Sequence, residues 1–228
     1  MSISLGFWNI NGLSSKVTDP NICTDLYNAI KHLDIICFLE SWTTVEQEES
    51  DHLNDLFEGF KGFIFSRKSD NVSQTRVSRG GCSIYIKSKL CDSVQIIDKK
   101  DGDTIWLKLC KTDLKLKSDI FIAAVYIPPQ NSPIWNKKQY DPFDELENDI
   151  LRFKSQGKII LGGDFNSRTH VLSDVYFPDS DNCNINMPYP QLLNDIPENE
   201  FLNVRNNQDL KINTWGRELI KICNNTDI

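Results

Sequence analysis

The sequence predicts a layered α/β or α+β domain. Short apolar runs rich in β-branched residues recur along the chain, and a few amphipathic helical segments lie between them. The 228 residues are 39% hydrophobic and 10% aromatic, which suffices for one sizeable core. Internal repeats, low-complexity tracts and interdomain linkers are absent from the sequence. These observations indicate strands mixed with helices, and they leave the strand directions open.

The first forty residues predict a strand, a helix and a second strand. Asn11-Gly12 is typical of a turn after the first strand, and Asp19-Pro20 of an N-cap followed by the first helical residue. One face of that helix carries Ile22, Leu26, Ile30 and Leu33. The two strands are expected at residues Ile3–Ile10 and at the buried run Ile35–Leu39, which ends at Glu40.

The middle of the chain predicts five more strands and a second helix. The strands are expected at Phe63–Phe65, Cys82–Ile86, Val94–Ile97, Ile105–Leu109 and Ile120–Tyr126. Pro128-Pro129 ends the last of them, and Asp141-Pro142 begins a helix. The apolar face of this helix is formed by Phe143, Leu146, Ile150 and Leu151.

The carboxyl-terminal part predicts one buried strand, a long loop and a third helix. The strand is expected at Ile159–Leu161, and the polar, proline-broken residues 167–213 are expected to form a surface excursion with little regular structure. Trp215, Leu219 and Ile222 indicate an amphipathic helix after it.

Composition excludes some classes of protein. Twenty-five basic against 32 acidic residues give a net charge of -7, unlike a strongly basic nucleic-acid-binding chain. An acidic metal site with a local basic rim is compatible with this balance.

The seven cysteines form no C-x-x-C pair, and Cys37, Cys82 and Cys110 lie in apolar runs, as reduced buried thiols do. The sequence shows no signal-peptide pattern and no membrane-spanning stretch, so we expect an intracellular protein, nuclear or cytoplasmic and not secreted.

The segment Gly162-Gly163-Asp164-Phe165-Asn166 carries the clearest chemical signal. Two glycines after an apolar strand permit a sharp turn or a close approach of the backbone to another group. Asp164 and Asn166 are two residues apart, so in extended chain they point to the same face. Asp164 can accept a proton or contact a metal, while Asn166 donates to an oxyanion. The alternative is an Asx-type turn in which both side chains bind local backbone.

Four predicted strands end in a polar or titratable residue. If these strands are neighbours, the polar residues meet at one rim, where rigid strands aim the loops. Each residue also has a plain structural explanation: a turn for the asparagines, a surface carboxylate for the glutamate, a strand aromatic for the tyrosine. The residues concerned are Asn9, Asn11, Glu40, Tyr126, Asp164 and Asn166.

The flanks and order of these motifs resemble the endonuclease/exonuclease/phosphatase superfamily. The motifs are W-N-I-N-G-L, I-I-C-F-L-E-S-W, A-A-V-Y-I-P-P and I-I-L-G-G-D-F-N, which follow in the family's order from residue 3 to about residue 224. The segments 40–42, 79–81, 126–129 and 164–169 look most like the endonuclease domain of LINE-type (non-LTR) retrotransposons. Each motif alone is weak, and the four in register are specific.

The resemblance implies a four-layer sandwich, in which two facing mixed β-sheets are covered by helices, and metal-dependent cleavage of phosphodiesters in DNA. It implies Glu40 as the main Mg²⁺ ligand, with Mn²⁺ as an alternative ion, assisted by Asn11 and the Asn9 segment. Asp164 would orient or deprotonate the attacking water, and Asn166 and Tyr126 would donate to the phosphoryl oxygens. Many superfamily members carry a carboxylate where this chain has Asn11, and LINE-type members often carry Asn.

Basic residues next to this set are candidates for DNA contacts. Arg67, Lys68, Arg76 and Arg79 form a loose basic segment beside Gly80-Gly81, which could follow a DNA backbone or form a solvated hairpin loop. Arg79 and Arg168 are the candidate substrate-binding residues.

The sequence departs from the family at its end. The family continues into strands that carry an Asp and then a Ser-Asp-His segment, whereas none of His32, His52 and His170 follows Ser-Asp. We expect one domain over residues 1–228 that lacks these final strands. His32 and His52 are expected to be solvent-exposed, and His170 is expected to be a loop residue rather than part of the site.

Three functions are therefore considered. The first is the DNA nickase of a retrotransposon-derived protein, whose full-length relatives continue into a reverse transcriptase in cis. The second is a catalytically inactive remnant that binds DNA or metal weakly, and the third is a small-molecule phosphoesterase of the same fold.

Overall fold

The computed structural model describes residues 2–67, 79–136, 141–170, 172, 209 and 211–228. The chain divides into two compact units, residues 1–166 and 167–228. The strands are β1 (Leu5–Asn9), β2 (Ile35–Leu39), β3 (Phe60–Phe65), β4 (Cys82–Lys87), β5 (Val94–Lys100), β6 (Thr104–Leu109), β7 (Asp119–Tyr126) and β8 (Gly157–Asp164). The α-helices are α1 (Leu13–Val17), α2 (Pro20–Ile30), α3 (Asp51–Asn54), α4 (Lys111–Leu114), α5 (Pro142–Lys154) and α6 (Thr214–Thr226). Three short 3-10 helices span Val45–Glu49, Ser88–Ser93 and Pro133–Asn136.

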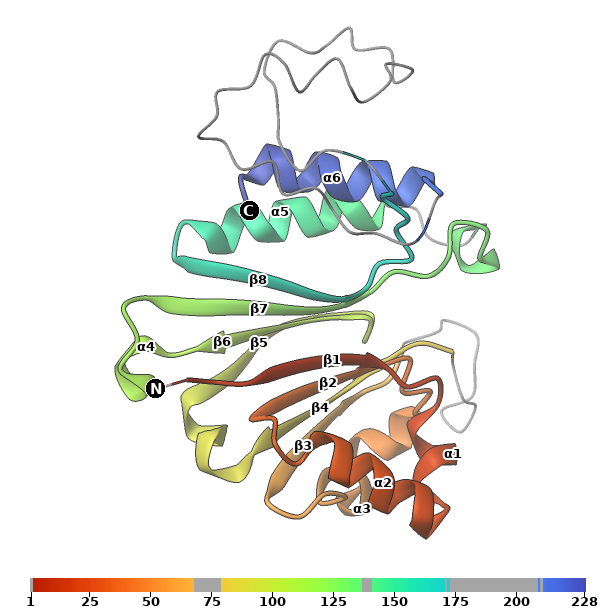
Figure 1. Ribbon diagram of the computed structural model, residues 1–228, viewed down its shortest axis with the longest axis vertical. Helices are drawn as coiled ribbons and strands as arrows, with labels where there is room; N and C mark the ends of the chain where they lie inside the picture. The colour runs from red at the N-terminus through yellow and green to blue at the C-terminus, as the bar shows by residue number, and fades with distance from the viewer. Residues whose placement is uncertain (1, 68–78, 137–140, 171, 173–208, 210) are drawn as a thin grey trace, which may run out of the picture. The chain divides into compact units, whose positions relative to one another are not determined.

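The first unit contains two four-stranded mixed sheets that face each other (Figure 1). Sheet A has the order β1-β2-β4-β3, and sheet B has the order β5-β6-β7-β8. Within the described part of the chain, each sheet has a single parallel pair, β1 with β2 and β7 with β8, and the other neighbours are antiparallel. Helices α1 to α3 lie outside sheet A and α5 lies outside sheet B (Figure 1). The predicted layered α/β sandwich is confirmed.

The main core lies between the sheets, and β2 shows why its sequence is apolar throughout. Ile35, Cys37 and Leu39 face sheet B, whereas Ile36 and Phe38 face the helices outside sheet A. All five residues of β2 are buried. A strand that is covered on both faces reads as a continuous apolar run rather than as an alternating one.

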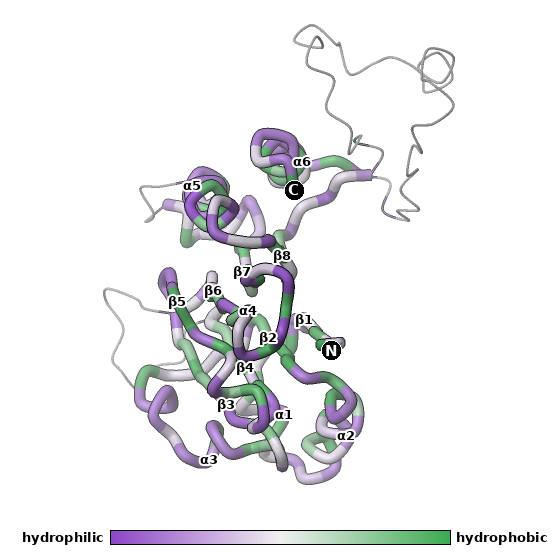
Figure 2. Tube along the Cα trace, turned by 90° about the vertical axis from the view of Figure 1, so that its left-hand side faces the viewer, coloured by the Kyte–Doolittle hydropathy of each residue, from purple (hydrophilic) through white to green (hydrophobic). Residues whose placement is uncertain are grey.

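Helix α2 begins as predicted and differs from the prediction along its apolar face. The Asp19 side chain accepts a hydrogen bond from the Asn21 amide, and Pro20 is the first helical residue. Leu26 and Ile30 are buried, but Ile22 is 44% exposed and Leu33 lies beyond the helix end. The prediction was wrong for Ile22, which lies in the first turn of the helix, because the buried part of this face begins one turn later at Leu26. The helices show both hydrophilic and hydrophobic residues in Figure 2, as amphipathic covering helices do.

Helix α5 covers sheet B with one change from the predicted face. Phe143, Leu146 and Ile150 are buried, whereas Leu151 is 52% exposed. Phe153 is buried instead, and its ring centroid lies 4.8 Å from that of Trp106 and 5.1 Å from that of Phe121. These aromatic contacts join α5 to β6 and β7.

Strand β8 is less buried than its sequence predicted. Ile159 and Leu161 are half-buried, and Ile160 is 39% exposed. Within the described residues β8 pairs only with β7, at the end of sheet B. An outer strand loses the cover that a second neighbour provides, so the apolar run here did not indicate full burial.

The second unit contains the predicted third helix. Helix α6 begins after Asn213, whose side chain accepts a hydrogen bond from the Gly216 amide. Ile220 and Ile222 are buried, while Trp215 is half-buried. The surface loop predicted over residues 167–213 lies mostly outside the described residues; those of it that are described form no helix or strand.

Two further expectations concern the cysteines and the membrane. Cys37, Cys82 and Cys110 are buried free thiols, as predicted, and burial raises the pKa of the Cys37 thiol far above its usual range. Among the described residues, the helices are too short or too polar to cross a bilayer.

Candidate active site

The two parallel pairs bring four strand ends to one edge of the first unit. Asn9 ends β1, and Glu40 follows β2, which runs parallel to β1 in sheet A. Tyr126 and Asp164 are register partners at the ends of the parallel strands β7 and β8 in sheet B. Parallel neighbours end at the same edge of a sheet, so each pair delivers its polar residues side by side.

Asn9 joins the two sheets at this edge. Its side-chain Nδ2 donates to Oε1 of Glu40 at 2.7 Å and to Oδ2 of Asp164 at 2.8 Å. One carboxamide therefore bridges two carboxylates from opposite sheets, using both of its N–H groups. Hydrogen bonds from a neutral donor to an ionised acceptor are among the stronger ones in proteins, and they hold the two negative charges close together.

Local turns also use these side chains. Oδ1 of Asp164 accepts from the Asn166 amide at 3.0 Å, and Oδ1 of Asn9 accepts from the Asn11 amide at 3.2 Å. Both contacts are Asx-type turns, the alternative that the sequence left open. The turns and the site are compatible, because each side chain uses one oxygen for its own turn and another atom for the contact between sheets.

Glu40 lies in a tight, unusual backbone segment. Its φ is 52° and that of Trp42 is 53°, in the left-handed region. Non-glycine residues in sparsely populated regions cost on the order of 1–3 kcal/mol each and gather at functional sites. The Trp42 indole Nε1 donates to Oε2 of Glu40 at 3.1 Å, so each carboxylate oxygen of Glu40 has a fixed donor. The Glu40 carbonyl accepts from the Gly12 amide at 2.8 Å, which anchors the segment to the start of α1.

Tyr126 stands beside this carboxylate. Its side chain is 6% exposed. Burial, followed by the negative charge of Glu40, raises the pKa of Tyr126 far above its usual range. The hydroxyl therefore keeps its proton at neutral pH and remains a hydrogen-bond donor at the edge shared with Glu40.

Glycines in β8 permit the contact between sheets. A Cβ atom on Gly162 would overlap the ring of Phe7 in β1, and one on Gly163 would overlap the carbonyl of Val125. Gly163 also has a φ of 142°, which other residues rarely adopt. The close approach predicted from these glycines is thus a contact between strands: Gly162, two residues before Asp164, approaches β1 of the other sheet, and Gly163 approaches β7 of its own sheet.

Four other predicted site residues lie outside the bridged group, which consists of the side chains of Asn9, Glu40 and Asp164. Asn11 has a φ of 51° and is exposed, and within the described residues its side chain makes no hydrogen bond to the group. Nδ2 of Asn166 donates to the Ile127 carbonyl at 2.9 Å, which occupies one of its two N–H groups. The exposed Arg79 lies with its guanidinium carbon 5.6 Å from the Trp42 ring centroid. Arg168 belongs to the second unit, where its Nε binds Asp209 at 2.8 Å.

The exposure of two histidines was predicted correctly, whereas the basic segment differs from its prediction. His32 and His52 are exposed, as predicted, and His170 belongs to the second unit. Arg67 is neither a solvated nor a DNA-facing residue: its side chain is 9% exposed and pairs with Asp103. Lys68 and Arg76 lie outside the described residues. Sequence reasoning missed Asp103 entirely, since an Asp after Asp101-Gly102 is an ordinary turn residue.

The donor set is compatible with a hard divalent cation. Glu40 and Asp164 supply carboxylate oxygens, a ligand type that Mg²⁺ takes together with water and substrate phosphate, whereas Asn9 turns its Nδ2 toward both carboxylates and its Oδ1 toward the Asn11 amide. Within the described residues there is no cluster of three or more acidic, histidine or cysteine ligands. One or two carboxylates suit a largely hydrated Mg²⁺, and they do not form a closed protein cage.

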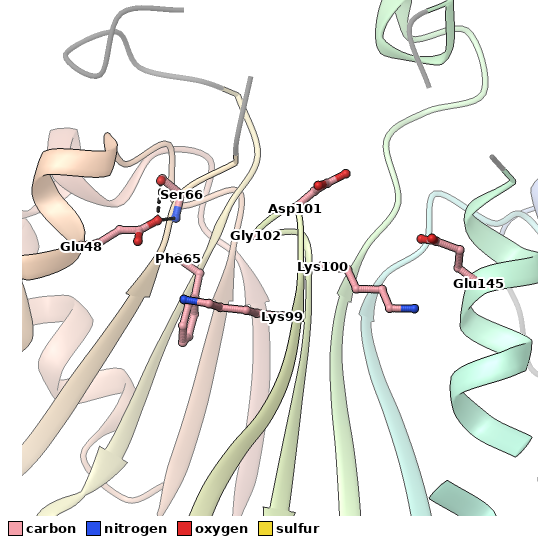
Figure 3. Close-up of a pocket in the computed structure, with 8 residues that line it drawn as sticks. All are labelled: Glu48, Phe65, Ser66, Lys99, Lys100, Asp101, Gly102 and Glu145. Atoms are coloured by element: carbon pink, nitrogen blue, oxygen red, sulfur yellow. Dashed lines mark hydrogen bonds between the residues drawn. The ribbon is translucent and has the colours of Figure 1, made fainter. Parts of the chain in front are cut away.

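A cleft of about 340 Å³ lies between the ends of β3 and β5 and helix α5 (Figure 3). A smaller pocket that includes Tyr126 shares Lys100 and Glu145 with it. Within the cleft, Glu48 accepts from the Ser66 amide at 2.8 Å and from its hydroxyl at 2.5 Å. Lys100 forms an ion pair with Asp149 at 3.0 Å. Two charged residues of the cleft, Glu48 and Lys100, therefore already have partners within the chain.

The first unit has two facing mixed sheets with helices on both outer faces (Figure 1), and Glu40 and Asp164 meet where the two sheets share an edge. These features define a protein of the four-layer α/β sandwich class. The chain belongs to the Endonuclease/Exonuclease/phosphatase family, whose model it matches over residues 6–187. No curated protein matches the chain.

Solved structures share this fold. The AP endonuclease LMAP from Leishmania major is 14% identical with a TM-score of 0.57, over 77% of this chain and 58% of that one. The catalytic domain of Xenopus laevis APE2 is 16% identical with a TM-score of 0.53, over 78% of this chain and 62% of that one. The chain therefore spans about three fifths of the length of either structure.

Proposed function

We propose that this chain is the endonuclease domain of a retrotransposon-derived protein, which hydrolyses a phosphodiester of DNA with the help of Mg²⁺. The observation that carries the proposal is the Asn9 bridge between Glu40 and Asp164, at 2.7 and 2.8 Å, beside the buried Tyr126. The LINE-type flanks of these residues support the retrotransposon origin. The chain would accordingly act in cis with a reverse transcriptase, as the resemblance implies.

Each residue has a role that follows from its contacts. Glu40, with Asn11 nearby, would hold Mg²⁺ or Mn²⁺, and the ion when bound would neutralise charge on the phosphoryl oxygens. Asp164 is oriented by Asn9 and by the Asn166 amide, so its carboxylate can accept a hydrogen bond from the attacking water and take its proton. Tyr126 and Asn166 would donate to the phosphoryl oxygens as negative charge increases. Arg79 and Arg168 would contact the DNA backbone.

A nicking assay on supercoiled plasmid with Mg²⁺ tests the proposal. We expect the wild-type chain to nick the plasmid. The nicking rates of Glu40→Ala and Asp164→Ala should be at least a hundredfold lower, since each substitution removes a group at the reacting centre. Asp144→Ala, which removes an exposed carboxylate from α5, is the matched control and should nick like wild type. Equal nicking by all four proteins would refute the assigned roles. Turnover of small phosphoesters without nicking would favour the phosphoesterase alternative.

The edges of the two sheets bear on a second candidate function. Strands β1 and β8 each pair with a single neighbour within the described part of the chain, and both lie at the ends of their sheets. Trp8 of β1 is 45% exposed and Ile160 of β8 is 39% exposed, so apolar surface is open along these two edges. This favours, as second candidate, a chain that is inactive by itself.

The second candidate has its own test. If the chain alone does not nick, a fusion that appends the final strands and Ser-Asp-His segment of an active family member should restore nicking. A fusion that folds but stays inactive would contradict the idea that the open sheet edges limit activity. Replacing the appended histidine with alanine is the control, because it keeps the added strands and removes the catalytic group.

A further inference from the structure

A buried ion pair lies directly behind the candidate active site. Nε of Arg67 donates to Oδ2 of Asp103 at 2.6 Å, and the two side chains are 9% and 6% exposed. Nη1 of Arg67 donates to the Arg79 carbonyl, while Nη2 is buried without a hydrogen-bond partner. Burying a charged pair costs desolvation free energy, and apolar residues of similar volume often stabilise a fold as well or better. Stability alone therefore does not explain why this pair is charged.

The pair connects the two sheets at the edge where the site lies. Arg67 follows β3 of sheet A, and Asp103 lies in the turn between β5 and β6 of sheet B. The backbone of this turn packs on that of Ser66, since a Cβ atom on Gly102 would overlap the Ser66 carbonyl. A shift of the pair would therefore move the ends of strands in both sheets.

Asp103 contacts both halves of the site. Its Oδ1 accepts from the Gly81 amide at 2.9 Å, and the Gly81 carbonyl accepts from the Ser41 amide at 3.2 Å, next to Glu40. Its own carbonyl accepts from the Tyr126 amide at 2.8 Å. One residue thus sets the backbone position of Tyr126 and, through Gly81 and Ser41, that of the Glu40 segment.

Arg67 contacts the tyrosine ring itself. Its guanidinium carbon lies 5.4 Å from the Tyr126 ring centroid, within the range of a cation–π interaction. The planar guanidinium is held by Asp103 and by the Arg79 carbonyl, so it presents a fixed surface to the ring. It has no space to move toward Gly80, where even a Cβ atom would overlap the guanidinium.

We propose that Arg67 and Asp103 are a positioning pair that fixes the ring and hydroxyl of Tyr126 relative to Glu40. The inference rests on the proposed function, because it assigns the pair to the same phosphodiester site. Neither residue touches the reacting atoms. The charge is retained because its hydrogen-bond geometry orients the guanidinium and the turn, which an apolar pair of equal volume does not do.

The test separates positioning from stability. The double variant Arg67→Met/Asp103→Leu replaces the pair with apolar residues, and Arg67→Lys keeps the charge without the planar fork. Lys99→Met is the matched control, since Lys99 is an exposed cation 5.6 Å from the Phe65 ring centroid, at the neighbouring cleft. Urea unfolding, nicking kinetics on plasmid, and NMR of ¹³Cζ-labelled tyrosine, assigned with Tyr126→Phe, are measured for each protein.

We expect the double variant to unfold at a somewhat lower urea concentration than wild type, because the buried Gly81 amide loses its acceptor, but to remain folded in water. Its kcat should fall about a hundredfold, the scale of a small misplacement of a reacting group. KM should change little, Arg67→Lys should recover part of kcat, and Lys99→Met should match wild type. An unchanged kcat in the double variant, or a loss explained by its unfolded fraction alone, would overturn the proposal.

The NMR measurement keeps the inference independent of activity. If the wild-type chain does not nick DNA, the proposed function fails as stated. The ¹³Cζ chemical shift of Tyr126 still depends on the surroundings of its ring, so it tests the positioning without activity. A shifted Tyr126 ¹³Cζ resonance in the double variant, with Lys99→Met unchanged, supports positioning of the ring by Arg67 and Asp103. An unchanged Tyr126 resonance in the folded double variant refutes it, whatever the activity.

Discussion

Gly162 in β8 lies so close to the ring of Phe7 in β1 that a Cβ atom at this position would overlap the ring. The contact joins the two sheets two residues before Asn9 and Asp164, which hydrogen-bond at 2.8 Å. The distance between the sheets at this edge therefore depends on the absence of one side chain.

Gly162→Ala should destabilise the fold and weaken the site together. Overpacking a core costs about 1–3 kcal/mol, and here the added methyl group pushes the strand that carries Asp164 away from Asn9. Urea unfolding measures the change. Phe7→Leu in the same chain makes room, so the double variant should recover part of the loss. Additive losses in the double variant would show that the two residues do not interact.

Asn9→Ala should make the stability of the fold sensitive to Mg²⁺. Without the carboxamide, the Glu40 and Asp164 carboxylates lose their shared donor and repel each other, a loss of about 1.5–3 kcal/mol for a hydrogen bond to a charged group. A cation that binds only the folded chain offsets this repulsion. Thermal unfolding with and without Mg²⁺ should therefore show a larger rise in Tm for Asn9→Ala than for wild type.

The control for this experiment is Asn28→Ala, which removes an exposed asparagine bonded to Lys31 in α2. Its Tm should respond to Mg²⁺ as wild type does. If Asn9→Ala and Asn28→Ala respond alike, the bridge does not hold the two carboxylates together.

Stability should fall at alkaline pH through Tyr85. Its buried hydroxyl donates to the Leu53 carbonyl at 2.8 Å, and burial raises the pKa of Tyr85 well above its usual value of about 10. Above that value the unfolded chain releases this proton while the folded chain keeps it, so the free energy of unfolding decreases as pH rises. The contribution is complete below pH about 10. It is lost progressively at higher pH.

Tyr85→Phe provides the comparison, because it removes the ionisable group and keeps the ring. We expect a loss of about 1 kcal/mol at neutral pH from the missing hydrogen bond. Above pH about 10 the decline in stability should be shallower than in wild type. Urea unfolding across this pH range measures both. Parallel declines in the two proteins would contradict the role of Tyr85.

The open edge of β8 should favour self-association. Ile160 is 39% exposed on a strand that has one neighbour within the described residues, and such edges pair with other chains unless a charge blocks them. Ile160→Lys should therefore reduce concentration-dependent association in sedimentation experiments. Leu151→Lys adds the same charge at a position that is 52% exposed on α5, away from a strand edge, and should have little effect. Equal effects would indicate general charge repulsion.

Much of the fold could be predicted because local patterns and tertiary structure agree. The caps at Asp19 and Asp141 and the run Ile35–Leu39 have local physical causes, and all three were correctly predicted. Ile22, Leu151 and the β8 run were wrong in burial, because exposure depends on which neighbour covers a residue and periodicity does not carry that information. The loose basic segment was misinterpreted at Arg67 for the same reason, since its partner Asp103 lies 36 residues away.

The sequence by itself determined the elements, the family motifs and the polar residues at four strand ends, because each of these depends on residues close together in the chain. Only the tertiary structure decided which of those residues meet. Asn9 reaches Asp164 across 155 residues because two parallel pairs end at one edge and Gly162 lets the sheets approach there. The Arg67–Asp103 pair behind Tyr126 likewise exists only once both sheets have formed, since a hydrogen bond between distant residues depends on where the fold places them.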